Sequence, residues 1–108
     1  MNFSVFTIPP FDKQIKRLSK KYPSLKLEFS ELLQSLQKNP NQGEPLGNNC
    51  YKIRISIGSK GKGKSGGARV ITYLKVTETS VYLISIYDKS ETQDISDNLL
   101  SELLNRIK

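Results

Sequence analysis

The sequence predicts an α+β fold, in which a small antiparallel β-sheet carries an N-terminal helical hairpin and a short C-terminal helix. Two observations predict the hairpin: apolar residues recur at helical spacing in two consecutive stretches before residue 40, and a Tyr-Pro pair separates the stretches. A third observation predicts the sheet, because runs between residues 50 and 87 either alternate apolar and polar residues or are continuously apolar. Because the chain has 108 residues, we expect it to form one domain over residues 1–108.

The first 40 residues predict a strand and two helices. Residues 2–8 alternate like a strand, which Pro9-Pro10 ends because proline has no N–H to donate to a sheet. The first helix then has an apolar stripe of Phe11, Ile15, Leu18 and Tyr22, and a basic face of Lys13, Lys16, Arg17, Lys20 and Lys21. A second helix over residues 23–38 has its own stripe of Leu25, Phe29, Leu32, Leu33 and Leu36. We interpret both stripes as core that covers the sheet.

The rest of the chain predicts three strands and a last helix. Residues 39–49 are turn residues throughout and predict a connector. The strands follow at 50–57, 69–75 and 81–87, and the last is apolar on both faces for most of its length, as in a central strand. Ser96 is a candidate N-cap for a helix over residues 97–107.

Positive charge is concentrated in the middle of the chain. The protein has 17 Lys and Arg against 10 Asp and Glu, a net charge of +7, and residues 50–76 hold seven cations and no acid. This balance predicts a polyanionic partner: RNA, DNA, an acidic protein segment or an anionic membrane surface. Glycines surround Lys60, Lys62 and Lys64, so we expect these lysines to be mobile contacts to a phosphate backbone.

Several classes of site are excluded by composition. The chain has no His and a single cysteine, Cys50, which rules out Cys/His zinc sites and His-based triads. One cysteine cannot form an internal disulfide, and the sequence has neither an apolar run of transmembrane length nor a signal-peptide pattern. We therefore expect a cytoplasmic protein that does not associate with membranes.

Lys52, Arg54 and Arg69 are candidates for an anion site. Alternation places Lys52 and Arg54 on one side of their strand, and Arg69 begins the next strand, so the three can converge on one anion. The planar fork of Arg69 suits the oxygens of a phosphoryl group. On spacing alone, a plain surface arginine is an equally good interpretation.

Tyr87 and Lys89 flank the point where the last strand leaves the sheet. Crowding by cations would lower the pKa of either group and favour acid-base chemistry near neutral pH. Packing is the alternative interpretation of Tyr87, and we interpret the other strand tyrosines, Tyr51, Tyr73 and Tyr82, as structural.

A P-loop pattern runs from Gly58 to Ser65, but its context argues against nucleotide hydrolysis. A P-loop must open a helix whose N-terminal amides hold phosphate. Here Gly66-Gly67 would break a helix, and residues 69–75 alternate like a strand.

Three segments together resemble the RelE/ParE toxin superfamily, and most closely its HigB-like RelE branch: Cys50-Tyr-Lys-Ile-Arg, Lys64-Ser-Gly-Gly-Ala-Arg69-Val-Ile and Tyr82-Leu-Ile-Ser-Ile-Tyr87-Asp-Lys89-Ser-Glu. The resemblance implies the toxin of a type II toxin-antitoxin pair. Such a toxin is an mRNA interferase: it cuts messenger RNA in the ribosomal A site by attack of a 2′-hydroxyl, with no metal or other cofactor. Its implied partners are a cognate antitoxin and the ribosome.

The resemblance also implies roles for single residues. Arg69 matches the family's transition-state arginine, Lys52 and Arg54 match its basic strand residues, and Lys89 lies near a second basic position. The C-terminal tyrosine of RelE aligns near Ile95, which cannot ionise. Either Tyr87 replaces it, or orientation and charge stabilisation suffice, and either Lys52 or Lys89 could accept the 2′-hydroxyl proton.

Two other functions remain open at this point. A ParE-like toxin would have a related fold but poison DNA gyrase, and it would need no phosphate site centred on Arg69. A non-catalytic RNA-binding module would lose only modest affinity when Arg69 is removed.

Overall fold

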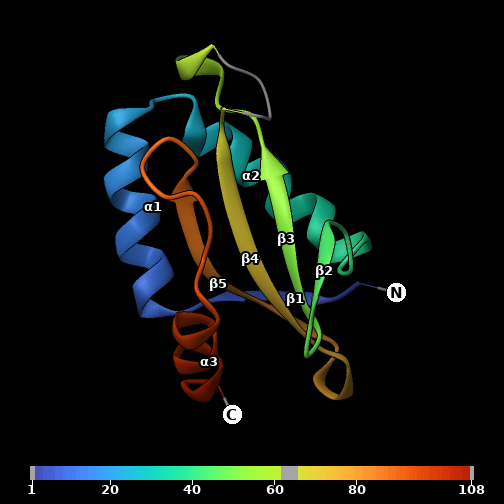
Figure 1. Cartoon of the computed structure of the whole chain (residues 1–108). Coiled ribbons are helices and arrows are strands. Elements are labelled where there is room, and N and C mark those ends of the chain that lie inside the picture. Colours follow the sequence, from blue (N-terminus) through green and yellow to red (C-terminus); the bar gives the residue numbers. More distant parts are fainter. Residues whose placement is uncertain (1, 62–65, 108) are drawn as a thin grey trace.

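The order of elements in the chain follows the predicted one, with one additional strand (Figure 1). A computed structural model describes residues 2–61 and 66–107. The helices are α1 (Pro9–Lys21), α2 (Leu25–Lys38) and α3 (Asp97–Asn105), and the strands are β1 (Ser4–Thr7), β2 (Glu44–Gly47), β3 (Cys50–Ile55), β4 (Ala68–Lys75) and β5 (Ser80–Asp88). Short 3-10 turns cover Gly58–Lys60 and Val76–Glu78. The α+β fold class predicted from the sequence is confirmed.

The five strands form one sheet in the order β1-β5-β4-β3-β2. The pairs β2-β3, β3-β4 and β4-β5 are antiparallel, but β1 runs parallel to β5, so the expectation of a purely antiparallel sheet is wrong at this edge. The parallel pairing arises because the α1-α2 hairpin follows β1 and returns the chain to the end of the sheet at which β1 ends. The strand β2 therefore runs opposite to β1, and after three antiparallel pairings β5 runs in the same direction as β1. β5 is an inner strand, as predicted.

The connector predicted at residues 39–49 contains β2, and this part of the prediction is wrong. Glu44 pairs with Lys52 and Pro45 with Tyr51, followed by a register shift before Gly47. The turn residues are accommodated because β2 is an edge strand, where proline and bulges are tolerated. Asn48 and Asn49 then close the hairpin with φ of 54° and 63°.

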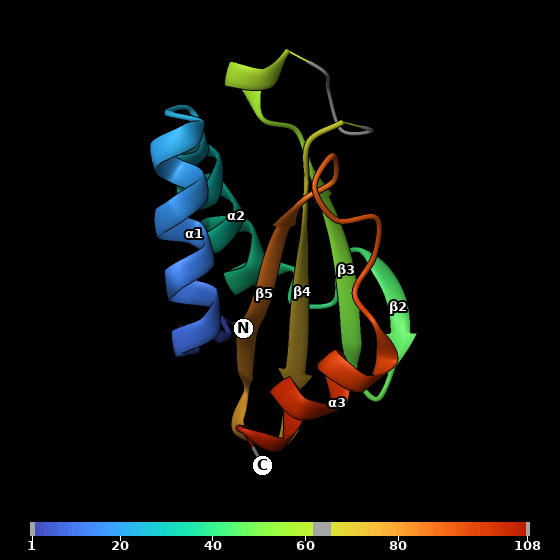
Figure 2. The ribbon, with the colours of Figure 1, turned by 60° about the vertical axis from the view of Figure 1, so that its left-hand side comes forward.

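Helices cover both faces of the sheet (Figure 2). The α1-α2 hairpin lies on one face, and α3 crosses the other face near the end of the sheet where β1 lies. Buried side chains from the hairpin, the sheet and α3 belong to one apolar cluster. Both predicted stripes contribute to it: Phe11, Leu18, Leu25 and Leu36 are fully buried, which confirms their assignment to the core.

Ser96 caps α3, as the sequence predicts. Its hydroxyl oxygen accepts a hydrogen bond from the backbone N–H of Leu99 at 3.1 Å, and Asp97 lies in the first turn. We expect Ser96→Ala to lower the free energy of unfolding by about 1 kcal/mol because that N–H loses its partner. Urea unfolding checks this value. Ser96→Asp keeps a cap and should stay near wild type, whereas equal losses in both variants would show that the cap is not the cause.

Candidate active site

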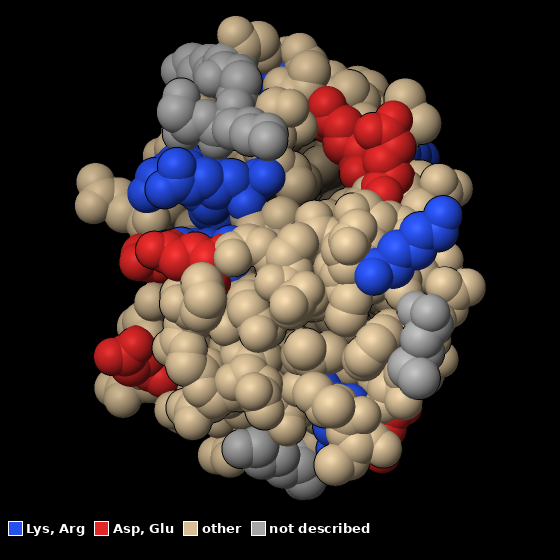
Figure 3. Space-filling model, turned by 90° about the vertical axis from the view of Figure 1, so that its right-hand side faces the viewer, with Lys and Arg blue, Asp and Glu red and all other residues tan. Residues whose placement is uncertain are grey.

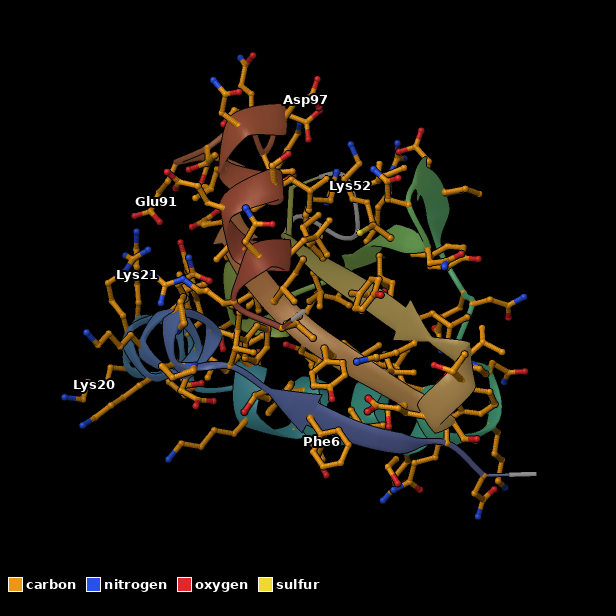
Figure 4. The ribbon with its side chains drawn as sticks, turned by 90° about the horizontal axis from the view of Figure 1, so that it is seen from below. Phe6, Lys20, Lys21, Lys52, Glu91 and Asp97 are labelled. Atoms are coloured by element: carbon orange, nitrogen blue, oxygen red, sulfur yellow. The ribbon has the colours of Figure 1, made fainter. Side chains whose placement is uncertain are left out.

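Cross-strand register brings Arg54, Arg69 and Tyr87 into one row. Arg54 is the partner of Arg69 in the β3-β4 pair, and Arg69 is the partner of Tyr87 in the β4-β5 pair. Residues directly opposite each other in a sheet project to the same face, and Lys52 shares it because it precedes Arg54 by two positions. The three cations therefore share one face of the sheet, and their convergence on one anion stays a prediction. We call the surface defined by Lys52, Arg54 and Arg69 the cationic face; Figure 4 shows Lys52 on the side of the sheet that α3 covers.

The three cations differ in exposure and in their partners. Arg69 is only 5% exposed, and its Nη1 donates to the carbonyl oxygen of Ala68 at 3.1 Å, so its side chain is largely shielded from solvent. Arg54 is exposed and has no ion-pair partner among the residues that the structure describes. Arg54 and Arg69 are register partners across β3 and β4, and an anion bound beside such a pair of like charges would be stabilising.

The cationic face borders an open edge of the sheet. Because β2 pairs with β3 only as far as Lys52, the backbone beyond that residue has no strand partner on this side. A hollow of about 430 Å³ here is lined by Gln42, Gly43, Glu44, Lys52, Ile53 and Arg54. Figure 3 looks onto this side of the molecule and shows a cluster of basic side chains with acidic side chains directly beside it, and largely uncharged surface over the rest of this view. The edge has room for an extended polyanion beside Lys52 and Arg54.

Asp94 connects Lys52 to Tyr87, a contact that the sequence analysis missed. Its Oδ1 lies 3.2 Å from Lys52 Nζ and also accepts a hydrogen bond of 3.2 Å from the Tyr87 hydroxyl. Burial works to raise the pKa of Asp94, but hydrogen bonds from the Ile95 N–H and from Lys52 outweigh it and hold the pKa below its ordinary value. Glu44 is a second carboxylate on Lys52, at 3.4 Å. A bound phosphate would have to compete with both carboxylates for Lys52.

Tyr87 has a raised pKa, so the expectation that cations lower it is wrong. Burial raises the pKa to about 12, the charge and hydrogen bond of Asp94 add to this effect, and the opposing influence of Arg69 is smaller. The phenol is therefore protonated at neutral pH. It can donate a hydrogen bond or a proton, but it is not a base there.

Tyr87 should also make stability depend on pH at the alkaline end. Because the pKa in the folded protein lies near 12 and the ordinary value for tyrosine is 10.0, the folded state keeps the proton to higher pH than the unfolded state. Stability should then fall as pH rises from about 10 to about 12. Urea unfolding across this range checks the prediction. Tyr87→Phe should remove this part of the decline, whereas an unchanged decline would assign it to other groups.

Lys60 is not the mobile phosphate contact that the sequence predicts. Its side chain is 7% exposed, and its Nζ lies 2.6 Å from Oδ1 of Asp88, which has no exposed surface. Asp88 also accepts hydrogen bonds from the hydroxyls of Tyr22, at 2.7 Å, and Ser90, at 2.7 Å. Burial works to raise the pKa of Asp88, but hydrogen bonds from Lys60, Tyr22 and Ser90 hold the pKa far below its usual range. Lys60 and Asp88 thus form a buried ionic cluster at the end of β5.

The remaining sequence candidates lie apart from the row. Lys62 and Lys64 fall outside the described residues. Lys89 Nζ donates to the carbonyl oxygen of Gln93 at 2.6 Å and touches none of the cations of the face among the described residues. Ile95 is half-buried and packs against the core. The P-loop interpretation stays rejected, because Gly66-Gly67 lie in a turn and bend and strand β4 begins at Ala68.

Over residues 2–61 and 66–107, no three His, Cys, Asp or Glu side chains lie together as a metal would need. None of the helices in the same ranges is both long and apolar enough to cross a bilayer.

Comparison with known proteins decides the family. The model of the family described as "RelE toxin of RelE / RelB toxin-antitoxin system" matches residues 11–106. The chain belongs to the RelE toxin family. The predicted resemblance to the RelE superfamily is thereby confirmed, while the HigB-like branch stays a prediction.

Solved structures of RelE toxins share this fold. A double arginine-to-alanine mutant of E. coli RelE in the free state superposes with a TM-score of 0.67 at 17% identity, over 100% of both chains. The intact E. coli RelBE toxin-antitoxin complex gives 0.50 at 22% identity, over 80% of this chain and 95% of the other. A metal-bound toxin from Helicobacter pylori gives 0.52 at 20% identity, over 82% and 97%. At these identities the likeness establishes the fold.

Proposed function

We propose that this RelE-family chain is a ribosome-dependent endoribonuclease, an mRNA interferase that cleaves messenger RNA in the ribosomal A site and so inhibits translation. The observation that carries the proposal is the row of Arg54, Arg69 and Tyr87 across three neighbouring strands, with Lys52 on the same face. Two neighbouring arginines can bind the oxygens of a phosphate and stabilise the negative charge that develops on it during the reaction.

The proposed chemistry needs no metal. The 2′-oxygen of the nucleotide before the scissile bond attacks the phosphorus and gives its proton to solvent water, the bond to the 5′-oxygen breaks, and a 2′,3′-cyclic phosphate and a 5′-hydroxyl form. Arg69 and Arg54 stabilise the charge on the non-bridging oxygens. Tyr87, protonated because its pKa is about 12, supplies a proton to the leaving 5′-oxygen.

In this proposal the ribosome supplies the remaining rate enhancement by positioning the message. Neither candidate base is free in this structure, because the Lys52 ammonium contacts Asp94 and the Lys89 ammonium donates to Gln93. An extended message presented at the open edge beside β3 would bring its own phosphates into competition with Asp94. A geometry imposed by the ribosome can replace a strong general base in part, since orientation alone contributes several kcal/mol to catalysis.

We further propose that the protein acts in the cytoplasm and is neutralised by a cognate antitoxin. Charge supports this partner: an acidic or amphipathic segment would complement the cationic face and cover the hollow at its edge. The E. coli relative in the RelBE complex is an example of such an assembly.

The test combines growth with cleavage mapping. Antitoxin-free induction should arrest growth, and primer extension on a reporter message should find breaks within the translated region only. Purified protein should cut the message on ribosomes and leave the naked message intact. Arrest with intact messages would instead indicate another target such as DNA gyrase, and neither arrest nor cleavage would indicate a binding module.

A further inference from the structure

The outer face of α1 carries a stripe of five cations that the proposed active site does not use. The α1 stripe consists of Lys13, Lys16, Arg17, Lys20 and Lys21, all of them exposed. Figure 4 shows Lys20 and Lys21 projecting from the helix away from the sheet. The only acid of the helix, Asp12, lies in its first turn.

Charge on the stripe is only partly balanced. Glu91 forms ion pairs with Arg17 at 3.0 Å and with Lys21 at 3.4 Å. Within the described part of the chain, Lys13, Lys16 and Lys20 have no ion-pair partner. Like charges four residues apart on a helix repel, as Lys16 and Lys20 do here, and an ordinary solvated face mixes both signs. A bound polyanion would offset this repulsion.

The shape of the stripe fits a linear polyanion. Its side chains surround a shallow hollow of about 560 Å³ that is lined by the five cations alone. From Lys13 to Lys21 the helix rises by about 12 Å. Side chains three and four residues apart lie in a row along one helix face. Such a row of cations suits a phosphate backbone, which is contacted without regard to base sequence.

Membrane and protein partners fit the stripe less well. The apolar face of α1 is not available for insertion into a lipid surface, because Phe11 and Leu18 are fully buried in the core. Protein interfaces have an apolar or aromatic centre and are depleted in lysine. The hollow on α1 is lined by lysine and arginine alone, whereas a neighbouring hollow that shares Lys16 and Lys20 also contains Ile15 and Phe29. A surface made of lysine and arginine favours phosphate recognition.

We propose that the α1 stripe binds the phosphate backbone of structured ribosomal RNA and so holds the cationic face at the message. This inference rests on the proposed function, since it assigns the ribosomal surface that the enzyme uses. The two regions share a segment: Glu91, which binds the stripe, lies three residues before Asp94, which binds Lys52. Docked RNA on α1 would therefore lie beside the segment that borders the active site.

The experiment compares two triple variants that remove equal charge. Lys13→Gln/Lys16→Gln/Lys20→Gln alters the stripe, and Lys38→Gln/Lys75→Gln/Arg106→Gln removes three cations elsewhere. Binding to vacant ribosomes and to a short RNA duplex is measured over a series of salt concentrations. The stripe variant should reduce the slope of log affinity against log salt by about 2 to 3, because each lost phosphate contact contributes about 0.9. The control should follow the wild type to within about one unit of slope.

Cleavage kinetics separate docking from chemistry. The stripe variant should raise the KM for programmed ribosomes by about tenfold or more and leave kcat unchanged at saturation. If the wild type binds ribosomes but cuts no message, the proposed function is wrong. The salt dependence of binding then still tests whether the α1 stripe contacts RNA phosphates. Equal slopes in both triple variants would overturn the inference. So would a stripe variant that binds RNA normally and loses only the antitoxin, since the stripe would then be a protein-binding surface.

Discussion

Asp88→Asn should lower the free energy of unfolding by about 3 to 5 kcal/mol, because it breaks a buried ion pair. Asp88 has no exposed surface, and its partner Lys60 is 7% exposed. The asparagine would leave the lysine ammonium buried without its counter-charge. It would also weaken the hydrogen bonds that Tyr22 and Ser90 donate to the carboxylate. A loss of this size is a large share of the total stability of a small domain.

The matched control is Glu91→Gln, three residues further along the chain. Glu91 pairs with Arg17 and Lys21 on the surface, with side-chain exposures of 36%, 57% and 49%. Exposed ion pairs contribute at most about 1 kcal/mol, so this variant should stay close to the wild type. Urea unfolding at neutral pH gives both values. Similar losses at the two positions would contradict the interpretation of Asp88 and Lys60 as a buried pair.

Acid should weaken the same cluster, and the sign follows from the pKa of Asp88. The folded state holds this pKa far below the ordinary value of 3.8 for aspartate, so the unfolded chain takes up a proton first as pH falls. The stabilisation is complete above about pH 5 and is lost progressively as pH drops below 4. If Asp88→Asn itself fails to fold, Tyr22→Phe provides the milder test. It removes one hydrogen bond to the carboxylate, should cost about 1.5 to 3 kcal/mol, and should leave the acid transition in place.

Arg69→Ala should lower the rate of ribosome-dependent cleavage by about 10²- to 10³-fold, which corresponds to about 2.7 to 4 kcal/mol of transition-state stabilisation. The guanidinium lies at the centre of the row, between Arg54 on β3 and Tyr87 on β5. A donor held on rigid strands needs little reorganisation when charge develops on the phosphate. Removing it should therefore lower kcat more than it raises KM.

Two control variants separate chemistry from folding and from net charge. Arg69→Lys keeps the charge but loses the planar fork, so most of the activity should still be lost. Arg106→Ala removes an exposed arginine after α3 and should leave cleavage unchanged. Because Arg69 is 5% exposed, thermal unfolding of each variant must accompany the rates. Wild-type cleavage by a folded Arg69→Ala protein would remove this residue from the active site.

Local pattern alone predicted most of the architecture. The apolar stripes of α1 and α2 and the cap at Ser96 are set by residues a few positions apart, so they can be read without knowing the fold. Alternation in β3 also predicted that Lys52 and Arg54 share a face, because side chains in a strand alternate with a period of two, whereas the register between β3 and β4 placed Arg69 on it. Family resemblance then added the interpretation of that face as a phosphate site.

Only the tertiary structure decided which charges neutralise one another and which groups can work as acids or bases. The cation-rich run from 50 to 76 contains no acid, yet Lys52 meets Asp94 from 42 residues away and Lys60 meets Asp88 from 28 residues away. Burial beside Asp94 reversed the expected pKa shift of Tyr87, and pairing with β3 made a strand from the turn residues of β2. These outcomes depend on contacts between distant segments and on the exclusion of water, neither of which has a local signature. Thus the sequence by itself determined the helices, the inner strands and the face that the cations of β3 share. The tertiary structure determined which of those cations are open to an anion.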